Sequence, residues 1–204
     1  MFKAIVVDIG GVILRTEDPT KRNKLEEKYG LLPGGAHELV FNSKPAKLST
    51  IGAVSSEKIW QHVAQQLELA PQALEEFKND FWLGDQIDHT LIQFLQKCRP
   101  QYKTALLSNA WLDARHIFAQ NYGIQEGKTV DKILISSELG VAKPDPKIFH
   151  ILSDTIDCRF DEMIFVDDFI ENIQSAHALG ITTIHYHSGI DLICEIKLRL
   201  SKTR

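Results

Sequence analysis

MFKAIVVDIGGVIL, residues 1–14, is the stretch of sequence that decides the fold. Its apolar run lacks the alternation of a half-exposed strand, so we expect residues 3–8 to form a strand covered on both faces, as in a parallel sheet. Asp8 then stands at the carboxyl end of the strand, where open α/β sheets bind ligands. Gly10 and Gly11 would let backbone N–H groups approach an anion closely. Taken alone, however, an Asp followed by two glycines favours a simple turn.

The second half of the chain continues this pattern with short buried strands separated by amphipathic helices. Further strands are expected at 104–107, 132–135, 163–166 and 181–185, and the intervening helices at 91–98, 114–121, 146–152, 171–179 and 190–200. Strands that alternate with helices are typical of an α/β fold with right-handed crossovers. The sequence therefore predicts a doubly wound parallel sheet.

Residues 15–85 interrupt this pattern directly behind the first strand. The sequence has no convincing strand between Leu14 and Lys103, and its apolar residues recur at helical spacing. Helices are expected to begin near Asp18-Pro19, at Ser55 or Ser56 and at Pro71, with a short helix at 36–42 and a loop at 43–54. We therefore expect an α/β core built from residues 1–14 and 86–204, and a helical insertion at 15–85.

Composition limits the possible functions of the 204-residue chain. A net charge of -4 and a pI near 6.1 argue against nucleic acid or an anionic membrane as a partner, and favour a small molecule. The three cysteines have no CxxC spacing, which argues against a disulfide framework or a zinc site and favours a cytoplasmic protein. No apolar run reaches the ~18 residues of a membrane span. The sequence does not determine the oligomeric state.

Polar groups suited to phosphate chemistry follow three of the expected strands. Asp8 ends the first strand, Ser108 follows the second, and the pair Asp167-Asp168 follows a later one. Because parallel strands bring their carboxyl ends to one edge of the sheet, these groups can converge although they are far apart in sequence. Lys143 lies in a loop that can reach the same edge.

Each of these groups also has an ordinary structural explanation. Ser108 could cap the helix that follows it, Lys143 could be a solvated loop charge, and the aspartates could form a helix N-cap. Two adjacent carboxylates at the end of a buried strand are harder to explain in this way, because like charges repel unless a cation joins them. Mg²⁺ usually binds about one or two carboxylates plus a substrate phosphate, so the whole set favours a magnesium site.

Four stretches of the chain resemble the motifs of the haloacid dehalogenase-like superfamily of hydrolases, in the same order and at strand ends. They are VVDIGGVIL at 6–14, LLSN at 106–109, GVAKPDPKIF at 140–149 and IFVDDFIEN at 164–172. The resemblance covers nearly the whole chain. It implies a Rossmann-like core and identifies the insertion at 15–85 as a small α-helical cap domain over the active site.

The resemblance implies a role for each matching residue. Asp8 would be the nucleophile that attacks phosphorus and becomes an aspartyl phosphate. Ser108 would hydrogen-bond the phosphoryl oxygens, and Lys143 would balance the charge of the nucleophile and the phosphate. The resemblance also implies an anion site formed by backbone N–H groups around Gly10, Gly11 and Asn109. It further implies a Mg²⁺ site formed by Asp8, the Gly10 carbonyl and Asp168, with Asp167 close by or acting through water.

Gly10 departs from the pattern of the family's phosphatases, which have a second Asp two residues after the nucleophile. That Asp serves as the general acid and base, a function that typically contributes roughly 10²–10⁴-fold. Another group or a water could replace it, the leaving group could need little protonation, or turnover could be slow. The sequence thus favours a Mg²⁺-dependent phosphatase acting on a small phosphorylated metabolite, such as a sugar phosphate. The alternatives are a hydrolytic 2-haloacid dehalogenase and a low-turnover binding or regulatory protein.

Overall fold

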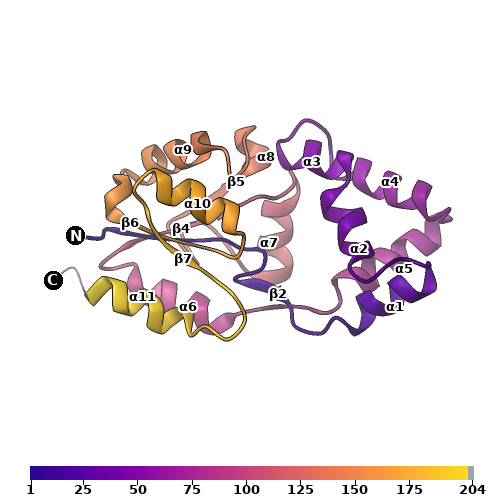
Figure 1. Ribbon diagram of the computed structural model, residues 1–204, viewed down its shortest axis with the longest axis horizontal. Helices are drawn as coiled ribbons and strands as arrows, with labels where there is room; N and C mark the ends of the chain where they lie inside the picture. The colour runs from indigo at the N-terminus through magenta and orange to yellow at the C-terminus, as the bar shows by residue number, and fades with distance from the viewer. Residues whose placement is uncertain (202–204) are drawn as a thin grey trace.

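The computed structural model describes residues 1–201, which form an α/β core and a group of helices beside it (Figure 1). The core contains a five-stranded sheet in the order β5-β4-β1-β6-β7, with every neighbouring pair parallel. Its strands are β1 (Ala4–Val7), β4 (Lys103–Ser108), β5 (Lys132–Ile135), β6 (Met163–Asp167) and β7 (Thr182–His185). The prediction of a doubly wound parallel sheet is therefore confirmed.

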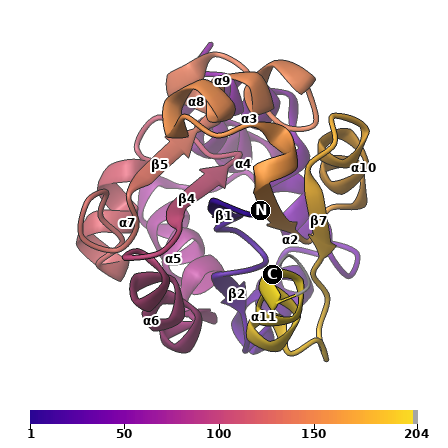
Figure 2. The ribbon, with the colours of Figure 1, turned by 90° about the vertical axis from the view of Figure 1, so that its left-hand side faces the viewer.

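Helices cover both faces of this sheet, which explains the continuous apolar run in β1 (Figure 2). Ile5 and Val7 face α6 (His89–Cys98), α7 (Ala114–Tyr122) and α11 (Leu192–Ser201). Ala4 and Val6 face α9 (Pro146–Ile156) and α10 (Ile170–Ala178). All four side chains are fully buried, and burying each larger one contributes about 1.5–3 kcal/mol. Two short elements complete the core, α8 (Ser136–Leu139) and η2 (Phe160–Glu162).

The helices between β1 and α6 form a separate group, which we call the helical insertion and define as residues 17–84. It contains α1 (Thr20–Lys28), α2 (Gly35–His37), the π-helix η1 (Glu38–Asn42), α3 (Lys44–Thr50), α4 (Glu57–Gln66) and α5 (Pro71–Trp82). Its buried side chains, among them Ile59, Val63, Phe77 and Phe81, form a hydrophobic cluster distinct from the two clusters of the core. Within residues 1–201, no helix is both long enough and apolar enough to cross a membrane.

Two short strands join the insertion to the core, which corrects the prediction that no strand lies between Leu14 and Lys103. β2 (Leu14–Thr16) pairs antiparallel with β3 (Asp85–Ile87). The Thr16 hydroxyl donates to the Asp85 carboxylate over 2.6 Å across this pair. Each strand has only three residues and a single apolar one, Leu14 or Ile87, so neither carries a strand pattern of its own.

The segment at 43–54 is a second correction, because α3 occupies most of the predicted loop. Ser43 is its N-cap, and the Ser43 hydroxyl accepts a long hydrogen bond of 3.3 Å from the Ala46 backbone N–H. Pro45 lies in the first helical turn, where a missing N–H costs nothing. Ser43 and Pro45 are residue types typical of loops, but the two together also mark the start of a helix.

Candidate active site

The parallel register brings the predicted site residues to the edge of the sheet that faces the helical insertion (Figure 1). Val7 of β1 pairs with Leu106 of β4 and with Val166 of β6. The next residue of β1, Asp8, therefore stands between the ends of its two neighbours. Lys143 reaches this point from the loop between α8 and α9.

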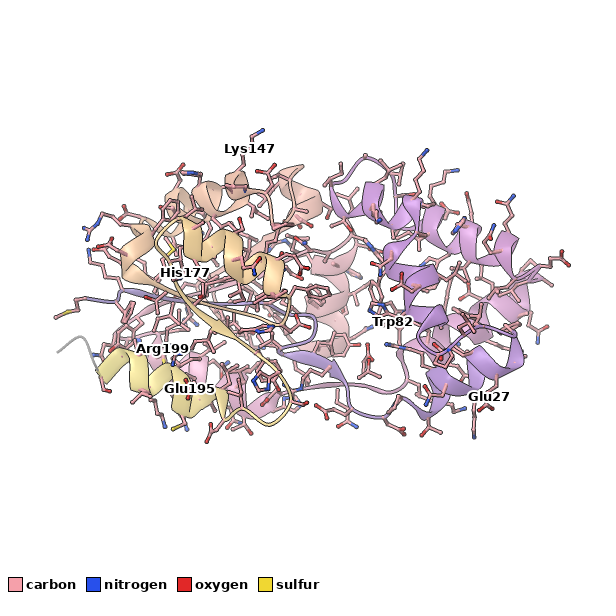
Figure 3. The ribbon with its side chains drawn as sticks, viewed as in Figure 1. Glu27, Trp82, Lys147, His177, Glu195 and Arg199 are labelled. Carbon is pink, nitrogen blue, oxygen red and sulfur yellow. The ribbon has the colours of Figure 1, made fainter. Side chains whose placement is uncertain are left out.

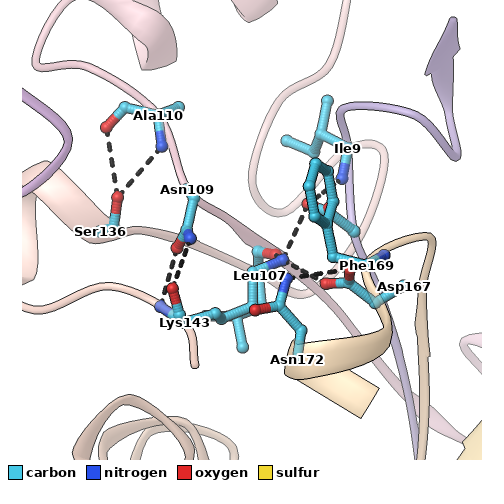
Figure 4. Close-up of polar contacts among 10 residues, drawn as sticks. Ile9, Leu107, Asn109, Ala110, Ser136, Lys143, Asp167, Phe169 and Asn172 are labelled. Atoms are coloured by element: carbon cyan, nitrogen blue, oxygen red, sulfur yellow. Dashed lines mark hydrogen bonds and ion pairs between the residues drawn. The ribbon is translucent and has the colours of Figure 1, made fainter. Parts of the chain in front are cut away.

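The Lys143 ammonium group connects the predicted residues (Figure 4). Its Nζ lies 3.0 Å from Asp8 Oδ1, 2.6 Å from Asp167 Oδ2 and 2.8 Å from the Leu107 carbonyl oxygen. These contacts use all three N–H donors of a lysine. The Lys143 side chain is fully buried, and burying a charge is tolerated only where it is paired in this way.

Asp167 is the inner partner of Lys143, and protein groups satisfy both of its oxygens. Oδ2 accepts from Lys143, while Oδ1 accepts from the Phe169 backbone N–H at 2.8 Å and from Asn172 Nδ2 at 3.0 Å. Asn172 lies in the first turns of α10 and is buried, but the sequence analysis missed it. The sequence does contain a signal for Asn172, because it is a polar residue on the face of α10 that is buried, just after the Asp pair.

Asp8 is 6% exposed and accepts a hydrogen bond of 2.7 Å from the Ile9 backbone N–H. Burial raises the pKa of Asp8 to about 7, and the charges of Asp167 and Asp168 add to this while Lys143 opposes it. For Lys143, burial by itself favours the neutral form, but Asp8 and Asp167 outweigh it and raise the pKa of the ammonium. Burial is thus the main cause of the Asp8 shift, whereas the charges of Asp8 and Asp167 cause the Lys143 shift.

Asp168 has the features expected of a metal ligand. One oxygen each of Asp8, Asp167 and Asp168 lie within 4.8 Å of one another. Asp168 Oδ1 is buried without a hydrogen-bond partner, and burial raises the pKa of Asp168 to about 6. An unpaired buried oxygen beside an excess of negative charge fits a hard divalent cation. His185 lies with Nε2 3.0 Å from the Asp168 carbonyl oxygen.

The two glycines after Asp8 have different surroundings. Gly11 has a φ of +74°, and a Cβ there would lie 1.9 Å from Asp168 Oδ2. The loop can thus approach the Asp168 carboxylate only because this residue is glycine. Gly10 is exposed, and a Cβ there would meet no atom within 4 Å.

The loop after β4 holds the remaining predicted residues. Ser108 is buried at the end of β4. The Asn109 side chain donates to the Lys143 carbonyl oxygen at 2.8 Å and accepts from the Lys143 backbone N–H at 2.9 Å. Asn109 thereby fixes the loop that presents Lys143 (Figure 4). That Asn109 contacts the substrate stays a prediction.

The same loop reaches the helical insertion through Trp111, which the sequence analysis did not single out. The Trp111 ring stacks on Phe41 with centroids 5.6 Å apart and meets Trp60 and Trp82 edge to face at 6.1 and 6.3 Å. We call these four half-buried rings the aromatic cluster. Figure 3 shows Trp82 where the insertion faces the core. Trp111 therefore links the loop that follows Ser108 to the insertion.

The parallel α/β core thus carries a buried arrangement of Asp8, Lys143 and Asp167 at the edge where its strands end. Residues 2–180 match the family described as haloacid dehalogenase-like hydrolase. The chain belongs to this family, as its motifs predicted.

Several relatives in the family are phosphatases. A sesquiterpene phosphatase of Aspergillus oryzae is 33% identical over 197 residues, covering 96% of this chain and 95% of the relative. A D-ribitol-5-phosphate phosphatase of Bacteroides thetaiotaomicron is 27% identical over 213 residues, covering 98% and 100%. Bifunctional epoxide hydrolase 2 of Mus musculus is 30% identical over 99 residues. That match covers 47% of this chain but only 18% of the longer relative.

Solved structures with the same fold include a magnesium complex of a haloacid dehalogenase-family enzyme from Bacteroides thetaiotaomicron. It has a TM-score of 0.76 and 20% identity, covering 96% of this chain and 98% of that chain. An L-2-haloacid dehalogenase from Xanthobacter autotrophicus, with chloropropionic acid covalently bound, has a TM-score of 0.66 and 17% identity, covering 98% and 83%. At these identities the similarity establishes the fold.

Proposed function

We propose that the chain is a Mg²⁺-dependent phosphatase that hydrolyses a small phosphorylated metabolite through an aspartyl phosphate. The observation that carries this proposal is the position of Lys143, whose ammonium contacts Asp8 and Asp167 beside the unpaired Oδ1 of Asp168. The phosphatase relatives, which align over nearly the whole chain, support it.

In this mechanism Asp8 attacks phosphorus with a carboxylate oxygen. Lys143 holds Asp8 in place and offsets its charge as the phosphoryl group approaches. Ser108 and the backbone N–H groups around Gly11 and Asn109 would bind phosphoryl oxygens. Water then attacks the aspartyl phosphate, which releases inorganic phosphate and restores the Asp8 carboxylate.

A Mg²⁺ ion would be held by Asp8, the Gly10 carbonyl and Asp168, with Asp167 contributing charge. Asp167 suits this outer role because Lys143, Phe169 and Asn172 already donate to its oxygens. When bound, the ion neutralises negative charge on the carboxylates and on the substrate phosphate. The Asp168 oxygen that has no protein partner would then have a cation as its partner.

The helical insertion, predicted at 15–85, would act as a cap that covers the substrate. Its direct ties to the core support this proposal. The Ser136 hydroxyl donates to the Thr50 carbonyl at 2.6 Å, and the Ser56 hydroxyl donates to the Asp113 carboxylate at 2.7 Å. Trp111 adds the ring contacts of the aromatic cluster. A substrate bound between Asp8 and these helices would be shielded from water.

The test is phosphate release from a panel of phosphorylated metabolites, with Mg²⁺ and with a chelator. We expect release that requires Mg²⁺ and that falls by roughly 10³-fold or more in Asp8→Asn, because an amide is a poor nucleophile. Asp154→Asn, on the exposed face of α9, is the matched control. Equal release by wild type and Asp8→Asn would contradict the proposal.

Hydrolytic dehalogenation is the second candidate, and Gly10 is the observation that favours it. A halide leaves without a proton, so a glycine at this position would cost nothing. The cluster of three carboxylates argues against it, because without a cation it would repel a 2-haloacid anion. Chloride release that persists in the presence of a chelator would favour dehalogenation, whereas ligand binding without any product release would favour a binding protein.

A further inference from the structure

Gly10 leaves open space beside the candidate nucleophile. The loop around it is fixed by backbone hydrogen bonds from Gly11 N–H to the Leu14 carbonyl and from Ile13 N–H to the Ile9 carbonyl, each 2.9 Å. Gly10 itself has no positive φ, and nothing lies within 4 Å of the position of its missing Cβ. Neither the backbone nor its neighbours require glycine here. The structure therefore has room for an acidic side chain that the sequence does not supply.

The charged groups that surround Asp8 are committed to one another and to the backbone. All three Lys143 N–H donors are engaged with Asp8, Asp167 and the Leu107 carbonyl. Asp167 accepts at both oxygens, and Asp168 belongs to the carboxylate cluster that fits a cation. Within residues 1–201, no ionisable side chain other than Lys143 pairs with the Asp8 carboxylate. Lys143 is therefore the charged partner of the Asp8 carboxylate, and Gly10 supplies no side chain that could protonate a leaving group.

Two other side chains are candidates for the acid. Arg15 is close to Asp8 in sequence, and His185 pairs with Asp167 in the sheet. Both have other partners. The Arg15 guanidinium donates to the Val12 carbonyl and pairs with Glu17 and Asp88. His185 directs Nε2 at the backbone carbonyl of Asp168 rather than at its carboxylate. None of these contacts is made with the Asp8 carboxylate.

We propose, resting on the phosphatase function above, that the substrate carries its phosphoryl group on a leaving group that departs as a stable anion. Such substrates are acyl phosphates, aryl or enol phosphates and phosphoric anhydrides, whose leaving groups are carboxylates, phenolates, enolates or phosphates. Alkyl phosphates, including sugar phosphates on an ordinary hydroxyl, would need the acid that Gly10 lacks. The proposal therefore narrows the expected substrates and disfavours sugar phosphates of this kind.

The two steps balance without a protein acid. The Asp8 carboxylate forms an O–P bond as the bridging P–O bond breaks, and that electron pair leaves with the bridging oxygen as an anion. Water then forms an O–P bond as the bond to Asp8 breaks, and the proton that the water loses ends on the released phosphate. Protonation of the leaving group contributes roughly 10²–10⁴-fold where a protein supplies it, so its absence penalises poor leaving groups most.

The test compares kcat/KM with Mg²⁺ for acetyl phosphate, p-nitrophenyl phosphate, phenyl phosphate and glycerol phosphate. This parameter reports steps up to the first irreversible bond cleavage, so it senses the leaving group even if hydrolysis of the aspartyl phosphate limits kcat. We expect kcat/KM to fall in that order, with acetyl phosphate favoured over glycerol phosphate by about 10²-fold or more.

Gly10→Asp supplies the missing acid and Gly10→Asn is its matched control, with the same shape and no carboxyl proton. We expect Gly10→Asp to narrow the ratio between acetyl and glycerol phosphate by about 10-fold or more, and Gly10→Asn to keep the wild-type ratio. A ratio that Gly10→Asp does not change, in a variant that melts like wild type, would overturn the inference. So would a wild-type ratio near one, which can be measured even if the variant does not fold. Failure to hydrolyse any of the four compounds would instead overturn the proposed function itself.

Discussion

The strand-end site and the helical insertion are held together by different forces. In the site, buried charges are fixed by one another, as Lys143 is by Asp8 and Asp167. In the insertion, apolar and aromatic side chains pack together, with Phe77 and Phe81 fully buried at its centre. Charge pairs depend on geometry and lose most when one partner is removed, whereas apolar packing loses in proportion to the volume removed. The two regions should therefore respond differently to the same kind of truncation.

The largest expected effect is in the site, at Lys143. Lys143→Met keeps much of the side-chain volume but leaves Asp8 and Asp167 without their shared cation. We expect phosphate release to fall by roughly 10³-fold or more. The free energy of unfolding should fall by about 3–5 kcal/mol, as when one partner of a buried ion pair is removed. Enzyme assays and denaturant unfolding measure the two effects. Lys147→Met on the exposed start of α9 is the control, and equal losses in both variants would contradict this account.

The corresponding truncation at the insertion is Trp111→Ala. It removes the ring that stacks on Phe41 and contacts Trp60 and Trp82. We expect a loss of about 2–3 kcal/mol, less than for a fully buried aromatic residue, because Trp111 is only half-buried. Denaturant unfolding measures the change. Leu112→Ala, at a neighbouring side chain that is 48% exposed, should cost under about 0.5 kcal/mol. A similar cost for both residues would mean that the aromatic cluster adds nothing.

A smaller effect should appear as a dependence of stability on pH to which Asp168 contributes. The pKa of Asp168 is raised to about 6, so its stabilising contribution is fully present below the unfolded pKa near 4 and is lost as the pH rises through about 6. Without metal, Asp168→Asn should therefore raise Tm relative to wild type at about pH 8 and have less effect at about pH 4. Thermal melts at the two pH values measure the difference. If Asp168→Asn instead lowered Tm at about pH 8, the native state would stabilise Asp168 as an anion.

The next prediction concerns metal rather than mutation. Mg²⁺ should raise the Tm of wild type at about pH 8 by binding the native state, which contributes about 2.7 kcal/mol at a hundred times Kd. The shift should be lost in Asp168→Asn and kept in Trp111→Ala, because the proposed ligands all lie in the core. Thermal melts with and without Mg²⁺ measure it. A shift that survives Asp168→Asn would place the cation elsewhere.

The smallest expected effect is at the exposed tie between the two regions. Ser56→Ala removes the hydroxyl that donates to the Asp113 carboxylate. An exposed hydrogen bond contributes at the lower end of the usual range of about 0.5–1.5 kcal/mol, so the free energy of unfolding should change by less than about 1 kcal/mol. Denaturant unfolding of Ser56→Ala beside Ser55→Ala, whose side chain is exposed, measures the difference. A loss as large as that of Trp111→Ala would show that polar ties, rather than ring packing, hold the insertion.

The core was predictable from sequence because its signals are local and strong. A run such as AIVV in β1, rich in β-branched residues, indicates a covered strand, and Asp145-Pro146 marks the start of α9 in both sequence and structure. β2 and β3 were not predictable, because their strand character comes from pairing with each other. The convergence of Asp8 with Asp167 and Asp168 followed from parallel topology, which places strand ends at one edge, whereas Lys143 reaches that edge from a loop.

Other parts of the site depend on contacts that sequence spacing does not encode. Trp111 belongs to the core by sequence, yet its ring packs among helices of the insertion. Asn172 and Asn109 act through hydrogen bonds to Asp167 and to the Lys143 backbone, and neither partner can be read from a periodic pattern. The missing acid at Gly10 was visible in the sequence. The open space around it required the structure.

The two adjacent glycines of the nucleophile loop should tolerate substitution in opposite ways. Any side chain at Gly11 would collide with the Asp168 carboxylate, so a library at this position should return glycine alone. Gly10 should accept many residues, because no atom lies within 4 Å of the position that a Cβ would take there. Under the proposed function, the leaving-group preference can therefore change at position 10 while the Lys143 and Asp168 side chains stay in place. Such a separation makes Gly10 a natural starting point for directed evolution of leaving-group preference.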